Sequence, residues 1–209
     1  MKTDDLLNML GTDRVAERPS GTVLWRWLVP AALFSFAAMA VGLGVRFPLS
    51  QSLFPPEILP KFVLPLLLGI LAAPLAMRFA RPLARPRLAW LWVIPLLGLA
   101  LLAFAYITTP SQARMMAFTG KSIIPCLVSI PALSAPLLAA FLMALRRGAV
   151  MAPMRAGLIA GFAAGGLGTA IYALHCTEDS PLFYVIWYGA GILITAGAGA
   201  LIGRKLLRW

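Results

Sequence analysis

Six long apolar runs constrain the fold of this chain more than any other feature of its sequence. A helix that crosses a lipid bilayer needs about 20 mainly apolar residues. Six stretches meet this requirement, at residues 24–45, 58–77, 88–107, 122–145, 154–174 and 182–202. Only 12% of the residues are charged, whereas a water-soluble domain is about one quarter charged. The sequence therefore predicts an all-α integral membrane bundle of six transmembrane helices.

The distribution of Lys and Arg predicts how these helices are oriented. If successive loops alternate between the two sides, 14 of the 18 basic residues fall on the side that holds both termini. Cytoplasmic loops carry the excess of basic residues, so we expect both termini in the cytoplasm and the chain in the bacterial inner membrane. Residues 1–23 would form a cytoplasmic segment and residues 24–209 the transmembrane domain. The net charge of +11 would then face the lipid bilayer, and no direct nucleic-acid partner is expected.

Acidic residues are scarce in the transmembrane part, which argues against several functional classes. After Glu17 the only acidic residues in the sequence are Glu57, Glu178 and Asp179. All three fall in or beside the predicted loops on the side opposite the termini. Ion-coupled transporters and pumps usually need ionisable residues near the middle of the membrane. The short signatures of common hydrolases and NTPases are also absent, so no enzyme is expected. A small transporter or channel for a neutral or cationic solute stays an alternative.

Glycines at helical spacing mark the last two spans. They are Gly157, Gly161, Gly165, Gly199 and Gly203. Small residues four positions apart let helix backbones approach closely in lipid. Two interpretations follow: the stripe packs helices within one bundle, or it forms a homodimer.

Prolines mark the fourth span, which contains Pro125, Pro131 and Pro136. A proline inside a helix removes a backbone hydrogen bond and bends the helix. We therefore expect a kinked helix, whose freed carbonyl groups are satisfied by neighbouring side chains.

The two cysteines are predicted to lie on the same side of the membrane. Cys126 is just inside the fourth span, and Cys176 is in the loop between the fifth and sixth spans. The predicted orientation places both at the periplasmic face, where the environment is oxidising and permits disulfides. The residues alone leave three interpretations open: inert thiols, a structural disulfide, or a thiol pair that senses oxidants or metals.

Further candidate metal ligands surround Cys176. The only histidine, His175, precedes it, and Glu178 and Asp179 follow it. Thiolate and imidazole groups are good ligands for soft metals. These residues are candidate auxiliary ligands for transient heavy-metal binding at the cysteines, although their spacing matches no zinc motif. No resident cofactor is expected.

Residues 1–11 predict a short cytoplasmic helix. They combine a candidate cap, two acidic residues and an apolar stripe, at Thr3, Asp4, Asp5, Leu6, Leu7 and Leu10. The acidic side chains suit the positive end of the helix dipole. Two helical turns are too few to be stable alone in water, so the apolar stripe predicts docking to a partner protein.

These features together resemble the NrsF family of bacterial inner-membrane anti-sigma factors. The resemblance extends over the whole chain: the acidic-leucine start, the six spans and the cysteine pair all contribute. Its most specific part is the C-terminal run, at residues 176–180, 187–189 and 203–209.

The resemblance implies a partner and a mechanism. The partner is an extracytoplasmic-function sigma factor, which is held inactive at the membrane. A metal or oxidative signal acts on the cysteines, here Cys126 and Cys176, and the sigma factor is released. The N-terminal segment of the family matches the acidic-leucine start, so the candidate sigma-factor contacts are Asp4, Asp5, Leu6, Leu7 and Leu10.

Overall fold

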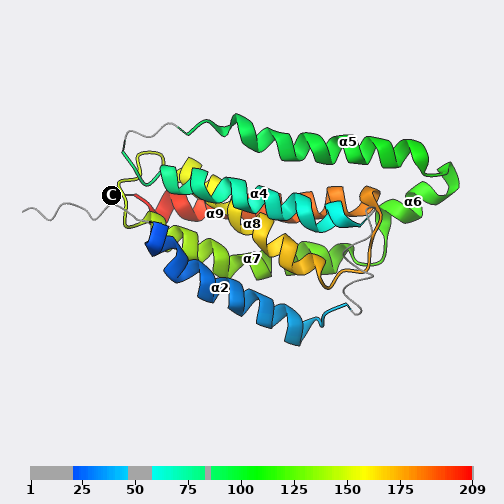
Figure 1. Cartoon of the computed structure of the whole chain (residues 1–209), viewed down its shortest axis with the longest axis horizontal. Helices are drawn as coiled ribbons and strands as arrows, with labels where there is room; N and C mark the ends of the chain where they lie inside the picture. The colour runs from blue at the N-terminus through cyan, green and yellow to red at the C-terminus, as the bar shows by residue number, and fades with distance from the viewer. Residues whose placement is uncertain (1–20, 47–57, 83–85, 209) are drawn as a thin grey trace, which may run out of the picture.

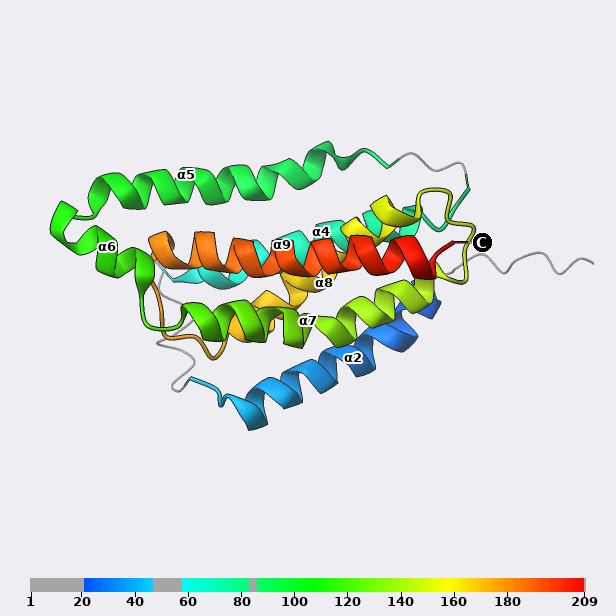
Figure 2. The same ribbon diagram turned by 180° about the vertical axis from the view of Figure 1, so that it is seen from behind.

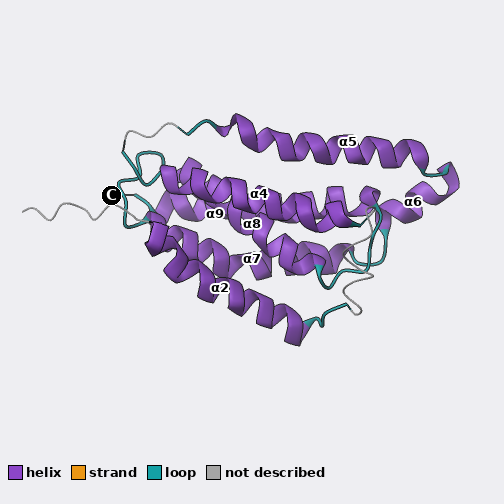
Figure 3. Ribbon diagram, viewed as in Figure 1, coloured by secondary structure: helices purple, strands orange, loops and turns teal. Residues whose placement is uncertain are grey.

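The structure, a computed structural model, describes residues 21–46, 58–82 and 86–208. All regular elements in these ranges are helical (Figure 3). The N-terminal helix predicted for residues 1–11 lies outside the described residues, and so do its candidate sigma-factor contacts Asp4, Asp5, Leu6, Leu7 and Leu10.

In the described part of the chain, six helices are long and apolar enough to cross a membrane. They are α2 (Gly21–Gly42), α4 (Leu59–Arg78), the continuous pair η1 (Leu88–Trp92) and α5 (Val93–Thr108), α7 (Ile123–Leu145), α8 (Pro153–Ala173) and α9 (Pro181–Leu206). Each matches a predicted span to within a few residues, so the prediction of six candidate spans is confirmed. Proline stands in the first turn of α4, α8 and α9, where it starts a helix without the loss of a hydrogen bond.

The helices form a bundle with α8 at its centre (Figure 1). α8 packs against α9, α4 and α7, while α2 packs mainly against α7. α5 runs along the outside of the bundle, beside α4 and α9, in both views (Figures 1 and 2). A short helix that the sequence did not predict, α6 (Ser111–Thr119), follows α5.

Basic residues segregate to one end of the bundle, which we call the basic end. There α2 and α8 begin, and α4, α7 and α9 end close to the C-terminus (Figure 1). The described basic residues at this end are Arg26, Arg78, Arg81, Arg87, Arg146, Arg147, Arg155, Arg204, Lys205 and Arg208. Those at the opposite end are Arg46, Lys61, Arg114 and Lys121. The alternating helix directions thus produce the charge asymmetry on which the predicted orientation depends.

The glycine stripe joins α8 to α9 within one chain. A methyl group added at Gly157 would collide with the carbonyl of Gly199, and one added at Gly161 would lie 2.5 Å from the Cα of Ala196. The two helices therefore meet backbone to backbone, as small residues permit. Packing within the bundle is the role that the structure gives to this stripe. A homodimer stays a prediction, and it would need another face.

The prolines of α7 coincide with a bend. Pro131 and Pro136 lie inside the helix, and its ribbon changes direction about half-way along (Figure 2). The hydroxyl of Ser35, from α2, donates a hydrogen bond of 2.8 Å to the carbonyl of Leu133 in this region. A neighbouring helix thus supplies a donor to a backbone carbonyl beside the bend.

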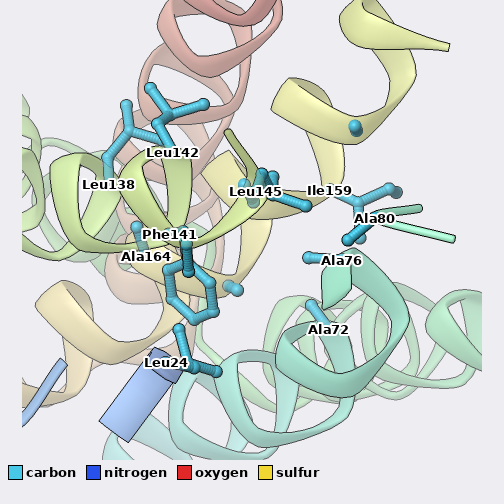
Figure 4. Close-up of a cluster of buried hydrophobic side chains, with 14 of the residues drawn as sticks. Leu24, Ala72, Ala76, Ala80, Leu138, Phe141, Leu142, Leu145, Ile159 and Ala164 are labelled. Atoms are coloured by element: carbon cyan, nitrogen blue, oxygen red, sulfur yellow. The ribbon is translucent and has the colours of Figure 1, made fainter. Parts of the chain in front are cut away.

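Three buried clusters lie among the described residues of the bundle, and the two with the most residues lie toward its two ends. The larger lies toward the basic end, where Figure 4 shows Phe141 of α7 near Leu24 of α2, with the alanines of α4 beside them. The smaller lies toward the opposite end and contains both cysteines. The outer faces of the helices carry exposed apolar side chains such as Phe104 and Leu193. Such faces suit contact with lipid rather than water.

Candidate functional site

The fold brings Cys126 and Cys176 into one buried cluster. Cys126 lies in the first turn of α7 and is 0% exposed, and Cys176 follows α8 and is 3% exposed. Both are free thiols. Fifty positions separate them in the sequence, but the start of α7 and the end of α8 meet at the same end of the bundle. The prediction that they lie on one side of the protein agrees with this placement, while a role in sensing stays a prediction.

Tyrosine side chains enclose the two thiols. The Cys126 thiol donates a hydrogen bond of 3.3 Å to the hydroxyl of Tyr172, which is 1% exposed. The ring of Tyr172 packs edge-on against Tyr188, with ring centres 5.9 Å apart. The hydroxyl of Tyr188 is buried without a hydrogen-bond partner within the described part of the chain. A buried hydroxyl of this kind is an unused donor, and it belongs to the same cluster as the thiols.

Hydrogen bonding and charge lower the pKa of the Cys176 thiol to about 5. The largest cause is the neighbouring Cys126 thiol, and the positive charge of Lys61 acts in the same direction. Burial opposes both effects, because it disfavours the charged form. The thiolate is the nucleophile and the metal ligand, so the lowered pKa favours the reactive form of Cys176.

A buried lysine lies next to Cys176. Lys61, in the first turn of α4, is 2% exposed. Its ammonium group donates to the carbonyl of Cys176 at 2.6 Å and to Asp179 Oδ1 at 3.1 Å. Arg46 donates to both carboxylate oxygens of Asp179, at 2.9 and 3.0 Å. A buried charge is tolerated only when it is paired and hydrogen-bonded, and Asp179 provides that pairing here.

The loop at residues 174–180 is attached to three other segments of the bundle. His175 Nδ1 lies 2.9 Å from the carbonyl of Gly44, beyond the end of α2, and it must donate because a carbonyl can only accept. A Glu178 carboxylate oxygen accepts the backbone N–H of Lys121 at 2.8 Å, just before α7. Lys61, in the first turn of α4, also contacts this loop, which we call the cysteine loop. The cysteine loop thus contacts the segment after α2, the first turn of α4 and the segment before α7.

The candidate auxiliary metal ligands are thus engaged in other contacts. His175 binds the segment after α2, Glu178 binds the segment before α7, and Asp179 binds Arg46 and Lys61. Across the described ranges, no group of three or more His, Cys, Asp or Glu side chains is arranged to hold a metal ion. A transient metal site at the two thiols stays a prediction.

Sequence reasoning did not identify several residues of this site. Lys61 and Arg46 were counted only for the orientation of the chain, and Tyr172 and Tyr188 were not considered as partners of the thiols. A partial signal was present for Lys61, since it is one of few cations on its side and stands inside an apolar span. Its partner Asp179 is 118 positions away, however, and no local pattern links the two.

Comparison with known proteins identifies the family. The family model described as NrsF, negative regulator of sigma F, matches residues 10–209. The chain belongs to the NrsF family. The resemblance noted from the sequence is therefore confirmed, and the family is a regulatory one.

Two relatives match over their full lengths. The probable anti-sigma-F factor NrsF of Azospira oryzae is 35% identical over an alignment of 219 residues, gaps included, which covers 100% of both chains. The anti-sigma-F factor NrsF of Caulobacter vibrioides is 34% identical over 216 residues, again with 100% of both chains covered. No solved structure matches the chain.

Proposed function

We propose that this protein is an anti-sigma factor embedded in the bacterial inner membrane, where it holds an extracytoplasmic-function sigma factor and releases it when two periplasmic thiols are modified. The observation that carries the proposal is the family match over nearly the whole chain, to a family of negative regulators of a sigma factor. The six apolar helices support the membrane location, and the arginines of the basic end support cytoplasmic termini.

The sigma-factor contact in this proposal is the acidic-leucine segment. Asp4, Asp5, Leu6, Leu7 and Leu10 would present an apolar stripe beside negative charge, and a partner groove would cover the stripe. Support comes from the fold, because α2 begins at the basic end. A segment that precedes α2 would then be on the cytoplasmic side, where a sigma factor is found.

The signal in this proposal acts on Cys126 and Cys176. Hydrogen peroxide would take two electrons and two protons from the thiols, so that an S–S bond forms and two molecules of water leave. A soft divalent metal ion would instead displace both thiol protons and bind both sulfurs. His175, Glu178 and Asp179 would assist the metal only after they leave their present partners. Either event joins the start of α7 to the loop after α8.

Transmission to the sigma factor would follow from the attachments of the cysteine loop. Because the loop contacts segments next to α2, α4 and α7, a shift of the loop displaces the ends of those helices. α2 leads directly to the proposed sigma-factor contact. The signal must bind the resting and released states unequally for this to work, and a bound sigma factor would oppose modification of the thiols to the same extent.

A binding experiment tests the anti-sigma function. Candidate sigma factors would be mixed with the solubilised full-length protein, either unchanged or carrying Leu6→Asp and Leu10→Asp together. We expect the double variant to lose binding, while Asp13→Asn, in the same segment but outside the stripe, keeps it. Binding that survives the double variant would place the contact elsewhere. No binding by the unchanged protein would overturn the proposal itself.

A reporter experiment tests the sensing step. Expression from a promoter controlled by the sigma factor would be followed after exposure to cadmium or peroxide. We expect Cys126→Ser combined with Cys176→Ser to abolish induction and keep basal repression. Unchanged induction in that double variant would contradict the assignment of the thiols, even if sigma-factor binding holds.

A further inference from the structure

An apolar groove runs between α2 and α4, from the basic end to Phe62 and Leu174, which pack against the cysteine cluster. It encloses about 810 Å³. α7 and α8, which lie between α2 and α4 (Figure 1), form its floor. Its walls and floor include Leu28, Val29, Ile70, Pro74, Leu137 and Leu167. The groove opens on the outer surface of the bundle, the surface that lipid would cover.

The dimensions of the groove suit a hydrocarbon chain. It follows α4 from Phe62 to Arg78, a length of about 24 Å at 1.5 Å per residue. One leaflet contributes about half of the roughly 30 Å hydrocarbon thickness of a bilayer, so the groove is longer than one leaflet is thick. The volume also falls within the range of about 300–1,000 Å³ that is usual for ligand sites. One acyl chain from a single leaflet therefore fits along the groove.

Positive charge lies at one end of the groove. Arg78 and Arg81 line it at the basic end, together with Trp25, which is 62% exposed. Across residues 21–46, 58–82 and 86–208, the ion pairs involve Asp179 at the opposite end of the bundle. No carboxylate in those ranges thus neutralises Arg78 or Arg81. Tryptophan and arginine together are typical of the depth of lipid headgroups.

We infer that this groove is a binding site for an anionic phospholipid of the bilayer, with one acyl chain between α2 and α4 and its phosphate on Arg78 and Arg81. The planar guanidinium group binds phosphate through paired hydrogen bonds, and two arginines at the mouth, without a carboxylate partner among the described residues, favour an anionic headgroup over a zwitterionic one. The bound chain would fill the space between α2 and α4. This inference is independent of the proposed sensing function.

Lipid titration of the purified full-length protein tests the charge selectivity. Native mass spectrometry would count bound phosphatidylglycerol and phosphatidylcholine with identical acyl chains. Each basic residue near a headgroup contributes about 1 kcal/mol. We therefore expect Arg78→Gln combined with Arg81→Gln to weaken phosphatidylglycerol binding by about 30-fold. The matched control is Arg146→Gln combined with Arg147→Gln, an exposed pair at the same end but outside the groove.

The titration has a clear negative outcome. Equal affinity of the unchanged protein for the two lipids would overturn the inference. An equal loss of binding in both arginine double variants would also overturn it, because it would show attraction to the basic end as a whole.

Photo-labelling tests the position of the acyl chain. A phosphatidylglycerol analogue with a diazirine in its acyl chain should label α2 and α4 at groove residues such as Leu28 and Ile70. We expect Ala73→Trp, which places a bulky side chain in the groove, to abolish this labelling. Leu99→Trp, on the exposed face of α5, should leave it unchanged. Labelling spread evenly over all helices would overturn the inference. A photoreactive amino acid placed at position 73 that cross-links to residues 1–20 in place of lipid would also overturn it.

Discussion

At the scale of single residues, the cysteine site depends on a partly buried charge cluster. Lys61 holds the carbonyl of Cys176 and one oxygen of Asp179, and Arg46 holds both oxygens of that carboxylate. Removal of one member from a buried pair costs more than the net contribution of the pair, because the remaining polar groups lose their partners. The position of the Cys176 loop therefore depends on a lysine in a different helix.

Lys61→Met should destabilise the protein measurably. It removes the donor to the Cys176 carbonyl and one partner of Asp179, a loss of about 2–3 kcal/mol. For a chain of this size, about 1 kcal/mol corresponds to a shift of roughly 2–4 °C, so we expect the melting temperature in detergent to fall by about 5–10 °C. Lys121→Met is the matched control, since its side chain is exposed at the same end. Equal shifts for both variants would contradict a specific role for Lys61.

The reactivity of Cys176 should depend only weakly on pH above about pH 6. Its pKa is lowered to about 5, so the thiolate is present above that pH and is lost as the pH falls through it. We expect its alkylation rate to change less than about twofold between pH 6 and 8, whereas an ordinary thiol of pKa about 8.5 changes roughly 70-fold. The measurement is brief iodoacetamide labelling in liposomes, with mass spectrometry of the Cys176 peptide.

Cys126→Ala provides the corresponding test of cause. It removes the thiol that lowers the Cys176 pKa most, so the pH profile of Cys176 alkylation should become steeper. A profile that is steep in the unchanged protein, or identical in both proteins, would contradict this assignment.

At the scale of helices, apolar length was sufficient to predict the spans, and local sequence was not sufficient to predict their partners. The six spans follow from runs of about 20 apolar residues, since the bilayer imposes that length directly. α6 was missed because nine residues of mixed character give no span signal. The contacts of Lys61, Arg46 and Glu178 join positions 57 to 133 residues apart, and they depend on which helices are neighbours. The cysteine pair was recognisable because both residues are rare and both fall on one side.

Close contact between α8 and α9 should tolerate no added methyl group at Gly157. An added Cβ would collide with the Gly199 carbonyl, whose backbone cannot move without a shift of the whole helix. Overpacking of this kind costs about 1–3 kcal/mol or more, so Gly157→Ala should reduce the fraction of folded, monodisperse protein after solubilisation. Gly197→Ala is the matched control, because nothing lies within 4 Å of an added Cβ there. A normal yield of the Gly157 variant would show that the helices are less closely packed.

At the scale of the whole molecule, the two ends of the bundle differ in chemistry. The basic end carries the exposed arginines, the mouth of the apolar groove and the start of α2. The opposite end contains the buried thiols and the charge cluster around Asp179. α2, α4 and α7 run between the two ends. A signal at the thiols and a partner at the basic end would therefore communicate through helices that both ends share, and this arrangement requires one particular orientation in the membrane.

We predict that the basic end faces the cytoplasm, because the excess of Lys and Arg in short loops marks the cytoplasmic side. Green fluorescent protein fused after Trp209 should fluoresce. Alkaline phosphatase, which is active only outside the cytoplasm, should be active when fused within residues 110–120 and inactive when fused within residues 147–152. The reverse pattern would place Cys126 and Cys176 in the reducing cytoplasm and residues 1–20 outside it. The proposed sensing step and the proposed sigma-factor contact would then both fail, since the periplasmic signal could not reach the thiols and the sigma factor could not reach residues 1–20.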